Sequence, residues 1–333
     1  MSSRTESSIA QTTPHRNAAR LAAGAGLLAF TAISWGGLLQ VAKPMLESID
    51  PVWLNTLRYA ASAPVFAIVL VLIEGRRALS FDGHALRMAA LGTIGFAGFG
   101  IVTLLGVQRT RPEHAALIVA LMPLVSALLA RLRGAAGVSP FTITCMLLGM
   151  LGVLVTASRG DPARILHGGA GAAEALVLTG VACWVVYTQG AAGFPSWSPL
   201  RYTALTCVAS LPGFALIAAG ASTFGWVAFP STLPADVWWG MGYIVVFATV
   251  LAMLGWNAGI RRLGPINGVL FINLLPVSAF AIGVSLGVRF SSAEVAGAAM
   301  VVASLVLSNL EARRRRAGAP MRAAIPASQE HVS

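Results

Sequence analysis

Two stretches of this chain repeat each other, RTRPEHAALIVALMPLVSA at residues 109–127 and RLGPINGVLFINLLPVSAF at residues 262–280. Each has an arginine, a proline three residues later, and a second proline eleven residues further on inside an apolar run. Two more prolines, Pro51 and Pro64, recur 148 positions later as Pro199 and Pro212. These correspondences predict that the chain is an internal duplication.

Composition predicts that the chain lies in a lipid bilayer. Of its 333 residues, 56% are hydrophobic and only 11% are charged, and its mean hydropathy is +0.77, whereas soluble domains carry about 25% charged residues. A helix needs about 20 apolar residues to cross a hydrocarbon core about 30 Å thick. We therefore expect an all-α integral membrane protein with ten transmembrane helices, at residues 21–40, 53–73, 86–107, 112–131, 140–158, 171–190, 199–219, 237–260, 264–287 and 292–310.

The number of spans in each copy predicts how the copies are related. Five spans form a first repeat at residues 21–158 and five form a second at residues 171–310, with a connecting loop at residues 159–170. A copy that follows an odd number of spans enters the membrane from the opposite side. The two five-helix repeats are therefore expected to be inverted, as in many secondary transporters, whose substrate site lies near the midplane between the repeats.

Arginine distribution predicts the orientation of the chain. Residues 1–20 and the basic tail at residues 311–333 are polar, and both are expected to be disordered and cytoplasmic. Arginine is concentrated in the loops on that side of the predicted spans, which is typical of the cytoplasmic side. The net charge of +11 is thus a topology signal beside membrane lipid, with no nucleic-acid partner implied. We expect the inner membrane, with both termini in the cytoplasm.

Residues 247–287, FATVLAMLGWNAGIRRLGPINGVLFINLLPVSAFAIGVSLG, resemble the eighth and ninth helices of the drug/metabolite transporter superfamily, in its ten-helix EamA-type branch. The shared features are Trp-Asn at a helix end, then Arg-Leu-Gly, then a helix with Leu-x-Pro-Val. In the first half, residues 33–63 resemble the opening Trp-Gly motif and the Leu-Arg-aromatic motif of the second helix, here Leu57, Arg58 and Tyr59. The likeness extends over residues 21–310.

The resemblance implies export of amino acids, other small metabolites or drugs by alternating access, without ATP hydrolysis. The sequence has no Walker-type phosphate loop. The family usually carries Gly-Glu after its fourth and ninth helices, where this chain has Leu132-Arg133 and Val288-Arg289, so no role of that acid is carried over. Two alternatives stay open, a passive facilitator or channel and a membrane-embedded transferase. An enzyme is not expected, because the sequence lacks the Asp-x-x-Asp and His-Glu-x-x-His patterns.

Polar and aromatic residues within the spans or at their ends are the candidate substrate contacts, because polar groups in a membrane usually face a cavity or a partner. By position, the set comprises Gln40, Arg58, Gln108, Glu113 and His114 at the outer end, Tyr187 and Asn257 at the inner end, and Trp35, Trp184 and Asn273 near the middle. Trp35 and Trp184 occupy equivalent repeat positions and are candidate aromatic walls, although packing alone is the commoner role.

Arg58 and Asn273 carry the sharpest expectations. Arg58 either snorkels to the membrane interface, or pairs with Glu113 or receives a substrate carboxylate. Asn273 is the first candidate for ligand contact, because it lies one turn before Pro276 and so combines an amide with loosened backbone. No acid lies at the midplane, so proton coupling would use Glu113 with His114 at the outer mouth.

Pro123 and Pro276 lie near the centre of their spans, where a proline removes one backbone hydrogen bond and kinks the helix. Gating and simple packing are equal alternatives for both.

The glycines of GTIGFAGFG, residues 92–100, predict close helix contact in the third span. Cys145, Cys183 and Cys207 have no metal-ligand spacing, and neither a metal site nor a cofactor is expected. The expected partners are a small-molecule substrate and lipid, and a homodimer stays open.

Overall fold

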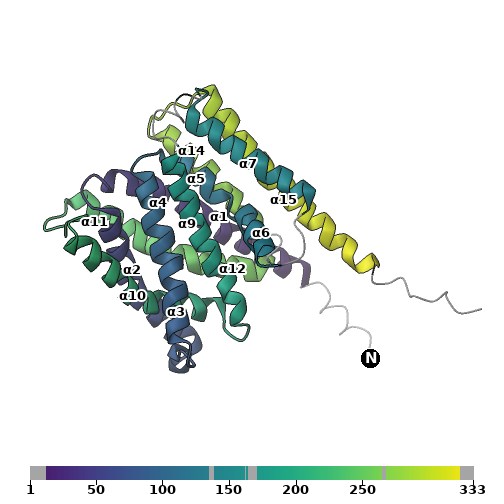
Figure 1. Cartoon of the computed structure of the whole chain (residues 1–333). Coiled ribbons are helices and arrows are strands. Elements are labelled where there is room, and N and C mark those ends of the chain that lie inside the picture. Colours follow the sequence, from purple (N-terminus) through teal and green to yellow (C-terminus); the bar gives the residue numbers. More distant parts are fainter. Residues whose placement is uncertain (1–12, 135–138, 162, 164–170, 265–267, 323–333) are drawn as a thin grey trace, which may run out of the picture.

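The computed structural model describes residues 13–134, 139–161, 163, 171–264 and 268–322, and every regular element in these ranges is a helix (Figure 1). The expected all-α class is confirmed for this part of the chain. The elements are α1 (Thr13–Met45), α2 (Pro51–Glu74), η1 (Arg76–Leu79), α3 (Ala85–Gly92), η2 (Thr93–Gly98), α4 (Phe99–Val107), α5 (Pro112–Ala120), α6 (Met122–Leu132), α7 (Pro140–Ser158), α9 (Ala172–Gly190), η3 (Ala191–Gly193), α10 (Pro199–Thr223), α11 (Ala235–Gly242), η4 (Tyr243–Leu251), α12 (Ala252–Leu263), η5 (Val269–Asn273), α14 (Leu274–Ser285) and α15 (Ser292–Arg322).

Several of these helices can cross a membrane. Among the described residues, eight helices are long and apolar enough, and a ninth is obtained if the bent pair α5 and α6 counts as one span. In the segment expected as another span, the apolar helix covers only Leu270–Ser285, and residues 265–267, with Pro265, lie outside the described residues. The fold is therefore that of a multi-span membrane protein, while ten spans and their inverted relation stay predictions.

Both helical ends extend further than expected. α1 begins at Thr13 and α15 continues to Arg322, so the expected disorder is wrong for residues 13–20 and 311–322. Residues 13–20, TPHRNAAR, place a proline in the first helical turn and then alanine and arginine, which are strong helix formers. Residues 311–317, EARRRRA, are strong helix formers throughout. Residues 1–12 and 323–333, and most of the expected connecting loop, lie outside the described residues.

Three helices begin with the same local signal, a capping side chain followed by proline. Asp50 Oδ1 accepts from Val52 N at 2.8 Å before α2, Ser139 Oγ from Thr142 N at 3.0 Å before α7, and Ser198 Oγ from Arg201 N at 2.9 Å before α10. Each cap satisfies one of the N–H groups that a helix start leaves without a partner, and proline loses nothing there because its missing N–H would be unpaired anyway.

Glycines bring the third span close to its neighbours, as expected. A Cβ on Gly92 would overlap the Thr206 carbonyl on α10, and a Cβ on Gly95 would overlap the Tyr187 ring on α9. The expected close contact is therefore confirmed. Small residues also allow close contact between α7 and α15, which run side by side along one flank of the bundle (Figure 1). Gly152 of α7 faces the Gly297 carbonyl of α15.

The regular helices are interrupted near the centre of the bundle. α5 and α6 meet at an angle of 45° beside Pro123, and the 3₁₀ segment η5 precedes the helix that contains Pro276. The π-helical segments η2 and η4 interrupt the expected third and eighth spans. Such irregular turns alter the backbone hydrogen bonding and are frequent at functional sites.

Following the chain defines two ends of the bundle. The starts of α5, α9 and α15 meet at one end, which we call the Glu294 end, where Thr110 contacts Glu174 and Arg111 contacts Glu294. The ends of α6 and α9 meet at the other, which we call the Tyr187 end, where Arg133 Nη1 donates to Gln189 Oε1 at 2.6 Å. The cavities are located by reference to these two ends.

Candidate functional site

A small cavity of about 80 Å³ lies between helices of the two expected repeats, and we call it the central cavity. Its wall is mostly apolar. The polar side chains in it that have no aromatic ring are those of Arg58, Thr103 and Thr249. The residues that line it are Trp35, Leu38, Leu39, Arg58, Tyr59, Phe99, Gly100, Thr103, Leu104, Val119, Met122, Trp184, Ala248, Thr249, Met253, Ile272 and Leu275.

A much larger cavity of about 1020 Å³, which we call the vestibule, adjoins the central cavity on the side of the Tyr187 end. It extends from Pro123 and Ser126 of α6 to Thr142 of α7 and Asn309 of α15, so the flanking pair α7 and α15 forms one of its walls. Five residues line both cavities and form the boundary between them, here called the constriction: Trp35, Met122, Trp184, Met253 and Ile272.

The two tryptophans of the constriction are fixed by neighbours. Trp35 Nε1 donates to the Ala248 carbonyl at 3.1 Å, and its ring centroid lies 5.4 Å from that of Trp256. The Trp184 ring lies 5.3 Å from Phe99 and 5.1 Å from Tyr187. Trp35 and Trp184, expected as aromatic walls, therefore stand together at the boundary of the two cavities.

Arg58 is buried within the bundle, with 7% of its surface exposed. Its Nε donates to Thr249 Oγ1 of η4 at 2.7 Å, and Thr249 Oγ1 donates in turn to the Ile244 carbonyl at 2.8 Å. Its Cζ lies 4.9 Å from the centroid of the Tyr59 ring. Snorkelling and pairing with Glu113 are both wrong as expectations, because the guanidinium lies inside the bundle and its partner is a hydroxyl 191 residues away.

Burying this cation is costly. An arginine at the centre of a transmembrane helix costs about 2.5–3.5 kcal/mol on insertion scales. One neutral hydrogen bond and an aromatic ring offset only part of that cost. Thr249, which holds Arg58, was not among the expected site residues. The signal for it in the sequence is weak, a single threonine in the apolar run YIVVFATVLAMLG, residues 243–255.

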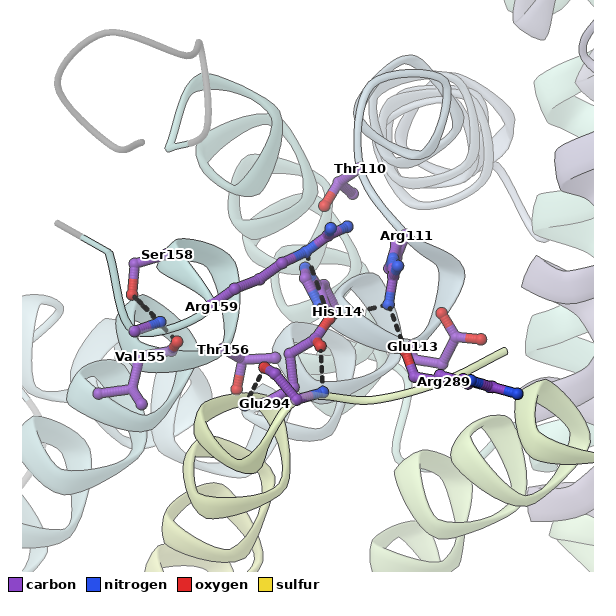
Figure 2. Close-up of polar contacts among 12 residues, drawn as sticks. Thr110, Arg111, Glu113, His114, Val155, Thr156, Ser158, Arg159, Arg289 and Glu294 are labelled. Carbon is purple, nitrogen blue, oxygen red and sulfur yellow. Dashed lines mark hydrogen bonds and ion pairs between the residues drawn. The ribbon is translucent and has the colours of Figure 1, made fainter. Parts of the chain in front are cut away.

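A buried carboxylate draws three helices together at the Glu294 end (Figure 2). Glu294 Oε1 lies 2.9 Å from Arg111 Nη1, 3.2 Å from His114 Nε2 and 3.4 Å from Arg159 Nε, and only 2% of its side chain is exposed. Its Oε2 accepts from the Ser291 backbone N–H at 2.8 Å, which caps α15. Glu294 therefore joins α5, α7 and α15. His114 was an expected site residue, but Glu294, Arg111 and Arg159 were missed.

A second group of hydrogen bonds covers the central cavity at the same end. Gln40 Nε2 donates to Glu113 Oε1 at 2.6 Å and to the Ala279 carbonyl at 3.0 Å. Lys43 Nζ donates to the carbonyls of Val107 at 2.7 Å and Gln108 at 2.9 Å. Gln40 and Glu113 thus lie together, as expected from their common end. Gln108 takes part through its backbone, while its side chain is exposed.

Tyr187, Asn257 and Pro123 all line the vestibule. Tyr187 is buried at its wall, where its ring stacks on Tyr202 at 5.1 Å and its carbonyl accepts from Tyr202 Oη at 2.7 Å.

A polar contact also closes the loop after α2 at this end. Arg201 Nη2 donates to Asp82 Oδ2 at 2.7 Å. The Ser80 hydroxyl, followed by Arg201, holds the pKa of the exposed Asp82 carboxyl below its ordinary value.

Asn273 does not lie where it was expected. Ile272 and Leu275 line the central cavity, whereas Asn273 lines neither cavity, and its Oδ1 is buried without a hydrogen-bond partner among the described residues. Successive residues of a helix point about 100° apart, and slightly more in a 3₁₀ turn, so facing Ile272 to the cavity turns Asn273 away from it. Pro276, one residue after Leu275, lines neither cavity.

Comparisons with known proteins agree with this architecture. The family model described as the EamA-like transporter family matches the chain twice, at residues 22–158 and 171–310. The chain is 30% identical over 290 residues to the uncharacterized transporter YrdR of Bacillus subtilis, covering 85% of this chain and 89% of YrdR. It is 28% identical to the uncharacterized transporter YyaM of the same organism, covering 85% of this chain and 92% of YyaM.

A solved crystal structure shares the fold. It superposes with a TM-score of 0.61 at 22% identity, covering 87% of this chain and 97% of that one. The resemblance of residues 247–287 to EamA-type transporters is thereby confirmed by matches that span most of the chain. Since the family model covers both halves and the described residues form a multi-span helical bundle, this protein belongs to the EamA-like transporter family.

Proposed function

We propose that this protein is a secondary-active transporter that exports small metabolites, such as amino acids or drugs, across the inner membrane by alternating access. One observation carries the proposal. The central cavity adjoins an open vestibule at the Tyr187 end, while side-chain hydrogen bonds and ion pairs join the helices at the Glu294 end. A cavity that is reachable from one side only is what an alternating-access carrier requires in each of its states.

Local features support two inverted repeats, at residues 21–158 and 171–310. The break at Pro123 and the 3₁₀ segment before Pro276 fall at corresponding positions of the two copies. The π-helical segments η2 and η4 correspond in the same way. Residues at the break between α5 and α6, in η4 and in η5 line the central cavity. The segment η2 ends one residue before Phe99, which also lines it. Pro123, which lines the vestibule beside the constriction, is the better placed of the two prolines for a gate.

Charge supports a cytoplasmic vestibule. The helix ends and connections at the Tyr187 end contain most of the arginines of residues 21–310, and the cytoplasmic side carries such an excess. A vestibule on that side is open to the cytoplasm in this state, and both termini then lie in the cytoplasm as well. Export is the direction that the resemblance to EamA-type transporters implies. The arginines concerned are Arg76, Arg77, Arg87, Arg131, Arg133, Arg201, Arg261 and Arg262.

Reconstitution tests this function. A panel of small metabolites is first screened for growth protection and efflux on overexpression, and the compounds that respond are tested in proteoliposomes. We expect saturable uptake that is accelerated by unlabelled substrate on the opposite side. Flux that shows no such counterflow would instead support a channel, and chemical conversion of the compound would support a transferase.

The Glu113→Gln variant is expected to lose the pH dependence of transport. Glu113 is 1% exposed and its carboxylate accepts a hydrogen bond from Gln40, so it is a buried acid among the contacts that join the helices at the Glu294 end. One coupled proton changes a rate by up to about tenfold per pH unit. The measurement is the uptake rate as a function of pH, with Glu47→Gln, an exposed acid near the same end, as the control. A pH profile in Glu113→Gln that matches the wild type would rule this coupling out.

A further inference from the structure

We propose that Arg58 is an anion subsite in the central cavity, and that the ligand it binds is a monocarboxylate with a small apolar body. The role of this ligand as the transported molecule rests on the proposed function. The binding itself does not, because it can be measured without transport.

The first step is the charge of the cavity. Arg58 is the only charged residue that lines the central cavity in the described part of the chain. The guanidinium group is a cation, so the cavity carries a positive charge. A buried cation without a counter-charge is unstable in a membrane and favours binding of an anion.

The second step is the absence of an internal counter-ion. Within the described residues Arg58 forms no ion pair, since the buried Glu113 accepts from Gln40 and Glu294 is held by Arg111, His114 and Arg159. The hydroxyl of Thr249 orients Arg58 without neutralising it. The positive charge in the cavity is therefore left for a ligand.

The third step is the geometry of the guanidinium. Its Nε is occupied by Thr249 Oγ1, while its two Nη nitrogens have no hydrogen-bond partner among the described residues. These two nitrogens form a planar fork, which matches the two oxygens of a carboxylate. Thr249 thus holds Arg58 with this fork available at the cavity wall.

The fourth step is the body of the ligand. A water-sized sphere needs about 10–15 Å³ on this measure, so a cavity of about 80 Å³ holds a carboxylate and a few carbon atoms. Anything larger extends into the constriction, where the Trp35 and Trp184 rings offer apolar faces. No described residue that lines the central cavity carries a carboxylate, so a ligand ammonium finds no partner there, which favours a monocarboxylate over a cation.

Equilibrium binding to the purified full-length protein in lipid nanodiscs tests the proposal, with radiolabelled benzoate as the probe. Benzamide has nearly the same shape without the charge, and benzylamine has the opposite charge. We expect saturable benzoate binding, with benzamide and benzylamine at least about tenfold weaker as competitors. Arg58→Gln should weaken benzoate binding at least about tenfold, and Arg58→Lys should fall between, because an ammonium keeps the charge but loses the fork. The matched control is Arg109→Gln, an exposed arginine.

A second variant covers the case in which Arg58→Gln does not fold. Thr249→Asp places a carboxylate beside Arg58 Nε, so it should keep the protein folded and abolish benzoate binding by neutralising the cavity. The proposal is overturned if benzamide competes as well as benzoate, or if Thr249→Asp or folded Arg58→Gln binds benzoate with wild-type affinity. Benzoate binding that depends on Arg58, without counterflow of any carboxylate, would contradict the transport function and leave the subsite standing. Counterflow of another compound without benzoate binding would contradict the subsite and leave the transport function standing.

Discussion

The Glu294→Gln variant is expected to transport at least about tenfold more slowly than the wild type and to expose the central cavity from the Glu294 end. Gln has nearly the same shape as Glu but no charge, so Arg111, His114 and Arg159 lose the carboxylate they share. Breaking a buried ion pair costs 3–5 kcal/mol as a rule. About 3 kcal/mol is expected here, because the two arginines are about a third exposed and are screened by solvent.

That free energy is enough to redistribute conformations. About 3 kcal/mol corresponds to more than a hundredfold change in an equilibrium constant. The contacts of Glu294 join α5, α7 and α15 in the form that is closed at this end, so their loss favours forms in which these helices separate. A carrier held in one state completes fewer cycles, which is why transport slows.

Cysteine labelling measures this shift. Leu39, which lines the central cavity, is replaced by cysteine in a background without Cys145, Cys183 and Cys207. A membrane-impermeant maleimide is added on the side of the Glu294 end. We expect slow labelling when Glu294 is present and at least about tenfold faster labelling in Glu294→Gln. The exposed acid Glu47 provides the control as Glu47→Gln. Equal labelling rates in both backgrounds would show that Glu294 does not hold this end closed.

The Gly95→Val variant is expected to yield little or no folded protein. A Cβ at this position would overlap the Tyr187 ring, which is buried and packed between Phe96 and Tyr202. Tyr187 cannot move aside without displacing both rings, so α9 itself must shift. Overpacking typically costs 1–3 kcal/mol, and we expect about 3 kcal/mol here because a rigid ring rather than a flexible chain is the obstacle.

Size-exclusion profiles and thermal unfolding in detergent measure the effect of Gly95→Val. The control is Gly242→Val. Gly95 lies in the π-helical segment η2 and Gly242 directly precedes the π-helical segment η4, but a Cβ at Gly242 meets nothing within 4 Å. The two substitutions share their helix-propensity effect, so a difference between them isolates the contact with Tyr187. A monodisperse Gly95→Val protein with the melting temperature of the control would contradict the packing argument.

Features that depend on neighbouring residues were predictable from the sequence. Hydropathy predicted the helical membrane class, and the glycines at residues 92–100 predicted close packing against other helices. The internal repeat added one longer-range prediction, because Trp35 and Trp184 occupy equivalent repeat positions and were therefore candidate aromatic walls. The structure places both rings in the constriction.

Features that depend on distant residues were not predictable. Arg58 and its partner Thr249 are 191 residues apart, and Arg111 is 183 residues from Glu294. Nothing in the local sequence around either acid or arginine encodes these pairings. The expectation for Asn273 failed for a different reason, because a 3₁₀ turn changes which side chains face the cavity. Composition does not show which side chains of a short irregular helix face a cavity.

The arrangement of α7 and α15 has a mechanical consequence. The pair is tied to α5 through Glu294 at one end, while the vestibule separates it from the bundle at the other. With 19 residues, α7 is a lever about 28 Å long at 1.5 Å per residue. A swing of about 10° around Glu294, smaller than the 15° rotations known in allosteric proteins, displaces its far end by about 5 Å. Because the contacts of Glu294 hold one end of this lever, a small rotation there would change the width of the vestibule at the other end.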